Sequence, residues 1–193
     1  ASQTASIFST PALLRQIRQE VERDRPDLQL DLSALRLESI RRALRQAGDD
    51  ENLAIPAFEV FFAERQRVNL FDDALPALEF LSARWPIVAV TNGNANVHTV
   101  GIGHFFQDSF NVMRTGFAKP DPRIFHLAAQ SVGVKAHEVL HVGDDAKLDA
   151  VAAKHAGMHA VWLNRSGIDW AVEGEQAPTT VASLQALCEM LTG

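Results

Sequence analysis

The sequence predicts an α/β protein: a doubly wound parallel sheet preceded by a helical domain. Two patterns support this prediction. Residues 1–70 carry amphipathic helical patterns and few strand signals, whereas residues 71–193 alternate short apolar, β-branched runs with helical patterns. Strands that alternate with helices form parallel sheets with helices on both faces. We therefore expect a helical domain at 1–70 and an α/β core at 71–193.

Three helices are expected in the helical domain. Thr10, which precedes a proline, predicts the start of the first helix, because its hydroxyl can cap the helix and proline suits the first turn. The second helix begins at Asp31 or Ser33 and stops at Gly48. The third covers about 52–68. Three such helices form part of a bundle and not a complete α/β domain.

Four strands are expected in the α/β core. They are the apolar runs at 85–90, 110–113, 139–142 and 160–163. A helix capped by Asp72 or Asp73 precedes the first strand, helices separate the strands, and a last helix near the C-terminus includes Val181. One helix is expected to run from Ala146 to a stop at Gly157.

Composition limits the partners. The chain has 193 residues, of which 47% are hydrophobic, enough for a sizeable core. The net charge of −6, without a basic block, argues against nucleic acid as a partner. No apolar run approaches the length of a membrane span. The single cysteine, Cys188, cannot form an internal disulfide and fits a reducing cytoplasm, which is the expected location.

Polar residues gather where three segments of the α/β core end or turn. They are Thr91, Asn92 and Gly93 after the first strand, Lys119 in a loop, and Asp144, Asp145 and Asp149 after the third strand. Active sites of parallel sheets lie at the carboxyl ends of the strands. A hydroxyl, backbone amides and an ammonium can bind phosphate, and clustered carboxylates bind hard cations. The pattern therefore predicts a phosphate and magnesium site.

Some roles stay open at this stage. Asp149 could instead favour the N-terminal dipole of its helix. Which of Asp145 and Asp149 supports the metal is not decided. All seven histidines, His141 included, are expected to be structural or solvated, because His141 belongs to a strand and helical metal-ligand spacing does not apply to it.

The same residues resemble a known family, the haloacid dehalogenase (HAD) superfamily. Order and spacing are similar to those of its second, third and fourth motifs: Thr91-Asn92-Gly93, Lys119-Pro120, and Gly143-Asp144-Asp145 with Asp149. The resemblance covers about 71–165 and is closest to phosphatase-type members, including those that act on flavin mononucleotide, small sugar phosphates or nucleotides. The helical part, 1–70, looks like a partial C1-type cap of this family.

The resemblance implies a Mg²⁺-dependent phosphatase that acts on a small phosphorylated metabolite. In such enzymes one Asp attacks phosphorus and forms an aspartyl-phosphate, and a second Asp two residues later acts as acid and base. Thr91 and Lys119 would hold the transferring phosphoryl group. Asp144 would ligate Mg²⁺, and Asp145 or Asp149 would orient the metal-bound water or Lys119.

One motif of the family is absent from these residues. No apolar strand followed by Asp-x-Asp-x-Thr occurs, although the family has this strand at the centre of its sheet. Either the attacking Asp lies outside the given chain, or the chain is a catalytically inactive relative. We favour the first alternative, because a sheet without its central strand leaves two unpaired edges.

Three other functions compete with the phosphatase. A 2-haloacid dehalogenase on the same fold expels halide without a metal, and so has little use for the carboxylate cluster of Asp144, Asp145 and Asp149. A signalling receiver domain also combines acidic residues, a hydroxyl and a lysine, but its acidic pair comes first in the chain, whereas here it comes last. A non-catalytic binding protein stays open because of the absent motif.

Overall fold

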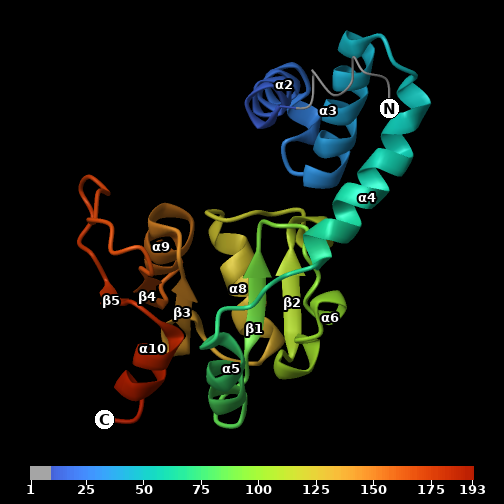
Figure 1. The fold of residues 1–193 in the computed structure, drawn as a ribbon. Helices are drawn as coiled ribbons and strands as arrows, with labels where there is room; N and C mark the ends of the chain where they lie inside the picture. The colour runs from blue at the N-terminus through green and yellow to red at the C-terminus, as the bar shows by residue number, and fades with distance from the viewer. Residues whose placement is uncertain (1–9) are drawn as a thin grey trace. The chain divides into compact units, whose positions relative to one another are not determined.

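The computed structural model describes residues 10–193 as two units, each considered by itself (Figure 1). The helical unit comprises the residues up to Val68 together with Gly93–Asn96. The α/β unit comprises Asn69–Asn92 and Val97–Gly193. A short loop of the predicted core therefore groups with the helices. Across residues 10–193, no helix is long and apolar enough to cross a membrane.

Three helices form the helical unit: α2 (Pro11–Asp24), α3 (Leu32–Ala47) and α4 (Ala54–Gln66), with 3₁₀ turns at Pro26–Leu28 and Glu51–Leu53. The predicted starts and stop are confirmed. The Thr10 hydroxyl accepts a backbone N–H at the start of α2, and the Asp31 carboxylate accepts two at the start of α3. Gly48, with φ 74°, ends α3 in the left-handed conformation that glycine adopts without strain.

The helical unit holds the 93–96 loop through one side chain. The amide nitrogen of Gln66, at the end of α4, donates to the Asn94 carbonyl at 3.3 Å. The Gln66 carbonyl oxygen accepts the backbone N–H of Asn96 at 2.8 Å. A single side chain thereby satisfies two backbone groups of the loop.

The α/β unit contains two parallel sheets. In one, β1 (Val88–Thr91) pairs with β2 (Asp108–Asn111); in the other, β3 (Leu140–Gly143), β4 (His159–Leu163) and β5 (Thr179–Val181) lie in that order. The predicted parallel α/β architecture is confirmed. Within residues 10–193, β1 has β2 as its strand neighbour and β3 has β4, so no ladder joins the two sheets.

Helices separate the strands of this unit. They are α5 (Ala74–Ser82), α6 (Val97–Val100), α7 (Val112–Thr115), α8 (Pro122–Ser131), the π-helix η5 (Ala146–Val151), α9 (Ala152–His155) and α10 (Leu184–Met190), with 3₁₀ turns at Gly103–Phe105 and Ala136–Glu138. Two predictions were wrong in detail. The strand expected at 110–113 ends at Asn111, where the Asn side chain caps α7. Val181 lies in a fifth strand, because Ser183 caps α10 after it.

Two apolar clusters cover opposite faces of the sheets. The first consists of side chains from β1, β2, β4, α8 and α9, among them Val90, Phe110, Phe125, Ala153 and Ala160. The second consists of side chains from β3, β4, β5, α5 and α10, among them Leu81, Val142, Val161, Val181 and Leu187. Adjacent residues of β4 point into different clusters, as the pleat of a strand requires. The first cluster includes strands of both sheets and so joins them.

The facing edges of the two sheets stay partly exposed. All four residues of β1 are only half-buried, and Leu140 in β3 is 38% exposed. Strands covered by helices on both faces are normally buried. The exposure is therefore a consequence of the unpaired edges of β1 and β3.

We predict that a protein of these 193 residues alone self-associates, because unpaired apolar strand edges pair with other chains. Size-exclusion chromatography with light scattering should show concentration-dependent species above monomer mass. A Leu140→Lys variant, which places a charge on the β3 edge, should shift the distribution toward monomer. A monodisperse, cooperatively melting monomer would contradict the prediction.

Asp73 has a different role from the predicted cap. It precedes α5, but its side chain makes no capping hydrogen bond there. Its carboxylate accepts two hydrogen bonds from the Arg165 guanidinium, at 2.9 and 3.0 Å, and the Leu184 backbone N–H at 2.7 Å. The hydrogen bonds from Arg165 lower the pKa of Asp73. The side chain thus joins the start of α5 to the segment after β4 and to α10.

The Asp73→Ala variant should lose about 2 kcal/mol of unfolding free energy, because a hydrogen-bonded charged group contributes on that order. Urea denaturation measures the difference. Asp72→Ala is the matched control, since Asp72 is exposed and adjacent, and it should change stability by less than about 0.5 kcal/mol. Equal effects of the two variants would refute the role given to Asp73.

Candidate active site at the carboxyl ends of β1 and β3

The residues predicted to bind phosphate and metal lie where β1 and β3 end. Thr91 is the last residue of β1 and pairs in register with Asn111 of β2. Asp144 and Asp145 directly follow β3, and Asp149 lies in the π-helix η5. Gly93 groups with the helical unit.

Asn92 clamps the loop that carries Lys119. Its side-chain amide donates to the Lys119 carbonyl at 2.8 Å, and its side-chain oxygen accepts the Lys119 backbone N–H at 2.8 Å. This pair of hydrogen bonds fixes the Lys119 backbone beside the end of β1. The peptide bond between Lys119 and Pro120 is cis.

The Lys119 ammonium reaches Asp149 across the strand ends. Its Nζ lies 2.5 Å from Oδ1 of Asp149. Asp149 is 3% exposed and belongs to the few buried polar side chains of the described part of the chain. Since a buried carboxylate is costly unless it is paired and hydrogen-bonded, this ion pair is a defined feature of the unit and not a solvated contact.

The end of β3 is shaped to receive Asp149. A Cβ atom on Gly143 would lie 2.3 Å from the Asp149 Cγ, so only glycine fits at that position. Oδ2 of Asp149 accepts the backbone N–H of Asp145 at 3.1 Å. Asp149 itself lies in a π-helical turn, a conformation often found at functional sites. Local backbone geometry therefore brings the carboxylate to the strand end.

His141 is a second side-chain partner of Asp149, and the sequence reasoning missed it. Its Nε2 lies 2.9 Å from Oδ1 of Asp149, the oxygen that also binds Lys119. The His141 ring packs edge-on against Phe125 of α8, with centroids 5.0 Å apart. Strand alternation could have indicated this contact, because His141 and Gly143 are two residues apart and share one face of β3, the face against which Asp149 lies.

Burial and hydrogen bonding act in opposite directions on Asp149. Burial alone would raise the pKa of its carboxyl group, but the His141 hydrogen bond and the Lys119 charge outweigh burial and lower the pKa to about 2. The group is therefore ionised at neutral pH. An ionised carboxylate only accepts hydrogen bonds, so His141 carries its proton on Nε2.

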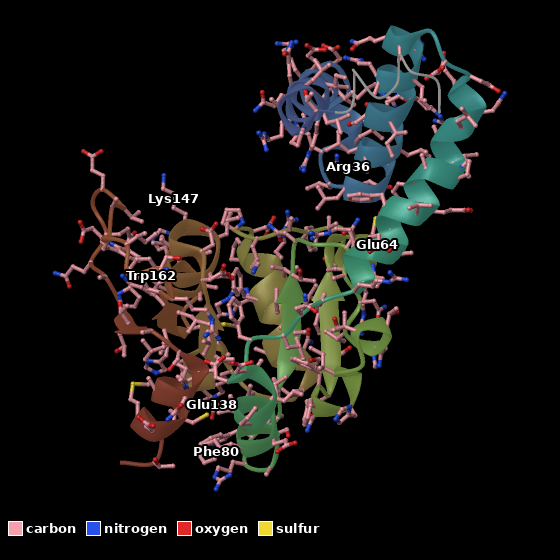
Figure 2. All side chains as sticks on the ribbon, viewed as in Figure 1. Arg36, Glu64, Phe80, Glu138, Lys147 and Trp162 are labelled. Carbon is pink, nitrogen blue, oxygen red and sulfur yellow. The ribbon has the colours of Figure 1, made fainter. Side chains whose placement is uncertain are left out.

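The other two carboxylates have different surroundings. Oδ1 of Asp145 accepts the backbone N–H groups of Lys147 and Leu148, which caps the π-helix. Asp144 is exposed, and its backbone carbonyl accepts the indole N–H of Trp162 at 2.9 Å. Trp162, labelled in Figure 2, lies in β4 and is 2% exposed. A buried indole thus fixes the main chain at Asp144 while its carboxylate faces solvent.

Carboxylates that could ligate Mg²⁺ are present, but they do not form a complete metal site. Asp144 and Asp145 offer exposed oxygen donors, which Mg²⁺ prefers. Within residues 10–193, no group of three or more His, Cys, Asp or Glu side chains is arranged to hold a metal ion. Mg²⁺ commonly keeps several water ligands and takes one or two carboxylates, so these residues fit part of a magnesium shell.

Comparison with known proteins identifies the family. The model of haloacid dehalogenase-like hydrolases matches residues 3–157. The chain belongs to this hydrolase family. This family assignment agrees with the parallel α/β fold and with the order of Thr91, Lys119 and Asp144 along the chain.

Relatives of this HAD-like chain include both phosphatases and dehalogenases. The 5-amino-6-(5-phospho-D-ribitylamino)uracil phosphatase YigB of Escherichia coli is 33% identical over 154 residues, which are 78% of this chain and 65% of that protein. The phosphoserine phosphatase of Thermus thermophilus is 34% identical, over 65% of this chain and 53% of that protein. The chain therefore spans between about half and two thirds of these relatives.

A solved structure supports the same fold. The 2-haloacid dehalogenase of Pseudomonas syringae pv. Tomato DC3000 superposes with a TM-score of 0.83 at 33% identity, covering 95% of this chain and 81% of that one. Because phosphatases and dehalogenases both appear among the relatives, the family alone does not decide the reaction.

The stability contribution of Asp149 should depend on pH in a defined direction. Its pKa falls from 3.8 to about 2 on folding, so the contribution is complete above about pH 4 and is lost as pH falls toward 2. Urea denaturation of the wild type and of Asp149→Asn should show a gap whose pH-dependent part is about 2 kcal/mol. A gap that stays constant or widens between pH 6 and pH 3 would be inconsistent with this assignment.

Proposed function

We propose that the intact protein is a Mg²⁺-dependent phosphatase that hydrolyses a small phosphomonoester through an aspartyl-phosphate. The observation that carries the proposal is the Lys119 ammonium, held at the strand ends by the buried Asp149, whose other oxygen accepts the backbone N–H of Asp145 in the turn that also carries the exposed Asp144. A fixed cation next to hard-cation ligands suits a phosphoryl group with bound Mg²⁺. The phosphatase relatives support the same reaction.

Each residue of the proposed site has a stated task. The Thr91 hydroxyl, the Asn92 backbone amide and the Lys119 ammonium bind the oxygens of the phosphoryl group. Asp144 would ligate Mg²⁺, and Asp145 would support its water ligands. Asp149 acts through Lys119, because its oxygens are taken by Lys119, His141 and the Asp145 N–H. When bound, Mg²⁺ neutralises negative charge on the phosphoryl oxygens.

The attacking carboxylate is proposed to lie outside the given residues. The unpaired edges of β1 and β3 support this part of the proposal, since both strands belong to one unit, in which the first apolar cluster joins β1 to β4, the strand that pairs with β3. An added parallel strand between them would end beside Lys119 and Asp144, where an attacking carboxylate is needed. The helical unit, residues up to Val68, is proposed as the cap that selects the substrate.

A 2-haloacid dehalogenase is the second candidate. It is favoured by the similarity to the dehalogenase of Pseudomonas syringae and by a 29% identity, over 134 residues, to (S)-2-haloacid dehalogenase 2 of a Pseudomonas strain. The exposed pair Asp144 and Asp145 counts against it, because halide displacement uses no metal ligands. A catalytically inactive binding relative is the alternative if neither reaction occurs.

The protein expressed from its complete reading frame should release phosphate from p-nitrophenyl phosphate only with Mg²⁺, and EDTA should abolish the activity. Asp144→Asn should lower kcat/KM by about 100-fold or more, because a metal ligand is lost. Asp169→Asn, an exposed carboxylate in the loop after β4, is the control and should leave activity unchanged. Activity that persists in EDTA, or halide release from 2-chloropropionate, would reject the phosphatase.

A further inference from the structure

We propose that His141 is a positioning residue for phosphate binding: it fixes the Asp149 carboxylate, which in turn fixes the Lys119 ammonium. This inference rests on the proposed phosphate-binding function and deepens it. From the sequence alone, His141 was expected to be structural or solvated.

Both carboxylate oxygens of Asp149 are fixed by hydrogen bonds. Oδ1 accepts from Nε2 of His141 at 2.9 Å, and Oδ2 accepts the Asp145 backbone N–H at 3.1 Å. The carboxylate is thereby held at both oxygens by donors that do not depend on Lys119. Without the imidazole, Oδ1 would keep only the ammonium, which is itself the group to be positioned.

The His141 side chain is itself held in place by packing. Its side chain is 13% exposed and lies on β3, with the ring edge-on to Phe125 of α8. Lysine, by contrast, carries a point charge on a flexible four-carbon chain, and its ammonium rotates freely. The position of the Lys119 ammonium is therefore set by its acceptor, and the acceptor is set by a rigid imidazole.

A purely structural role would be met more simply by an apolar side chain. His141 lies on the face of β3 that meets α8, where the first apolar cluster packs. Burying a polar ring there has a cost that is offset only by a hydrogen bond. The hydrogen bond it makes is directed at the single oxygen that holds Lys119.

The test measures binding of inorganic phosphate in the presence of Mg²⁺, by ³¹P NMR line broadening, to the protein expressed from its complete reading frame, so that turnover is not required. His141→Leu should weaken phosphate binding about tenfold. His141→Gln should stay close to the wild type, because its amide can donate from nearly the position of Nε2. Lys119→Met should also weaken binding, and adding His141→Leu to it should cause no further loss.

His126→Leu is the matched control for structural effects. Nε2 of His126, on α8, lies 2.9 Å from the Ala156 carbonyl, so this variant also loses a partly buried histidine hydrogen bond. It should lose stability in urea denaturation but keep phosphate affinity. If His141→Leu does not fold, His141→Asn replaces it, because the shorter amide should not reach Asp149 and should bind phosphate as weakly.

Three results would overturn the positioning role alone: wild-type affinity in His141→Leu, an equal further loss when it is added to Lys119→Met, or the same affinity loss in His126→Leu. A different result would overturn the proposed function and this inference together. That result is wild-type phosphate affinity in Lys119→Met, or no phosphate binding by the wild type.

Discussion

The ion pair between Lys119 and Asp149 is the constraint on which the α/β unit depends. Asp149 is 3% exposed, and moving a carboxylate out of water costs several kcal/mol unless partners replace the lost hydration. Here the partners are the Lys119 ammonium, the imidazole of His141 in β3, and the backbone N–H of Asp145 in the turn after β3. The charge is tolerated only where these segments meet, so the ion pair specifies their arrangement.

This network also compensates for a missing ladder. Among the strands of residues 10–193, β1 and β3 form no pair, yet the end of β1 is connected to the end of β3 through side chains. Asn92 holds the Lys119 backbone, Lys119 holds Asp149, and Asp149 packs against Gly143. These polar contacts lie at the carboxyl ends of β1 and β3. The first apolar cluster connects the two sheets through side chains of β1, β2 and β4. The same contacts therefore support the fold and build the candidate site.

The sequence predicted helix ends well where the capping residue and its partners are neighbours in the chain. The hydroxyl of Thr10, the carboxylate of Asp31 and the left-handed Gly48 were readable because capping involves neighbours in sequence. Asp73 was not, since its partner Arg165 is 92 residues away. The role of His141 depends likewise on a tertiary contact with Asp149, and the short strand that contains Val181 has too few residues for a periodic signal.

Charge at the strand ends links phosphate to magnesium in the proposed function. Asp149 neutralises Lys119 within the buried pair, which leaves the exposed Asp144 and Asp145 as uncompensated negative charges in the turn after β3. A phosphate group that approached Lys119 would also meet these two carboxylates and be repelled. A divalent cation on Asp144 reverses the sign of that field, because a bound ion is the largest local charge in such a site. In the proposed function, phosphate recognition by these residues would therefore require the metal, which is why the two are proposed together.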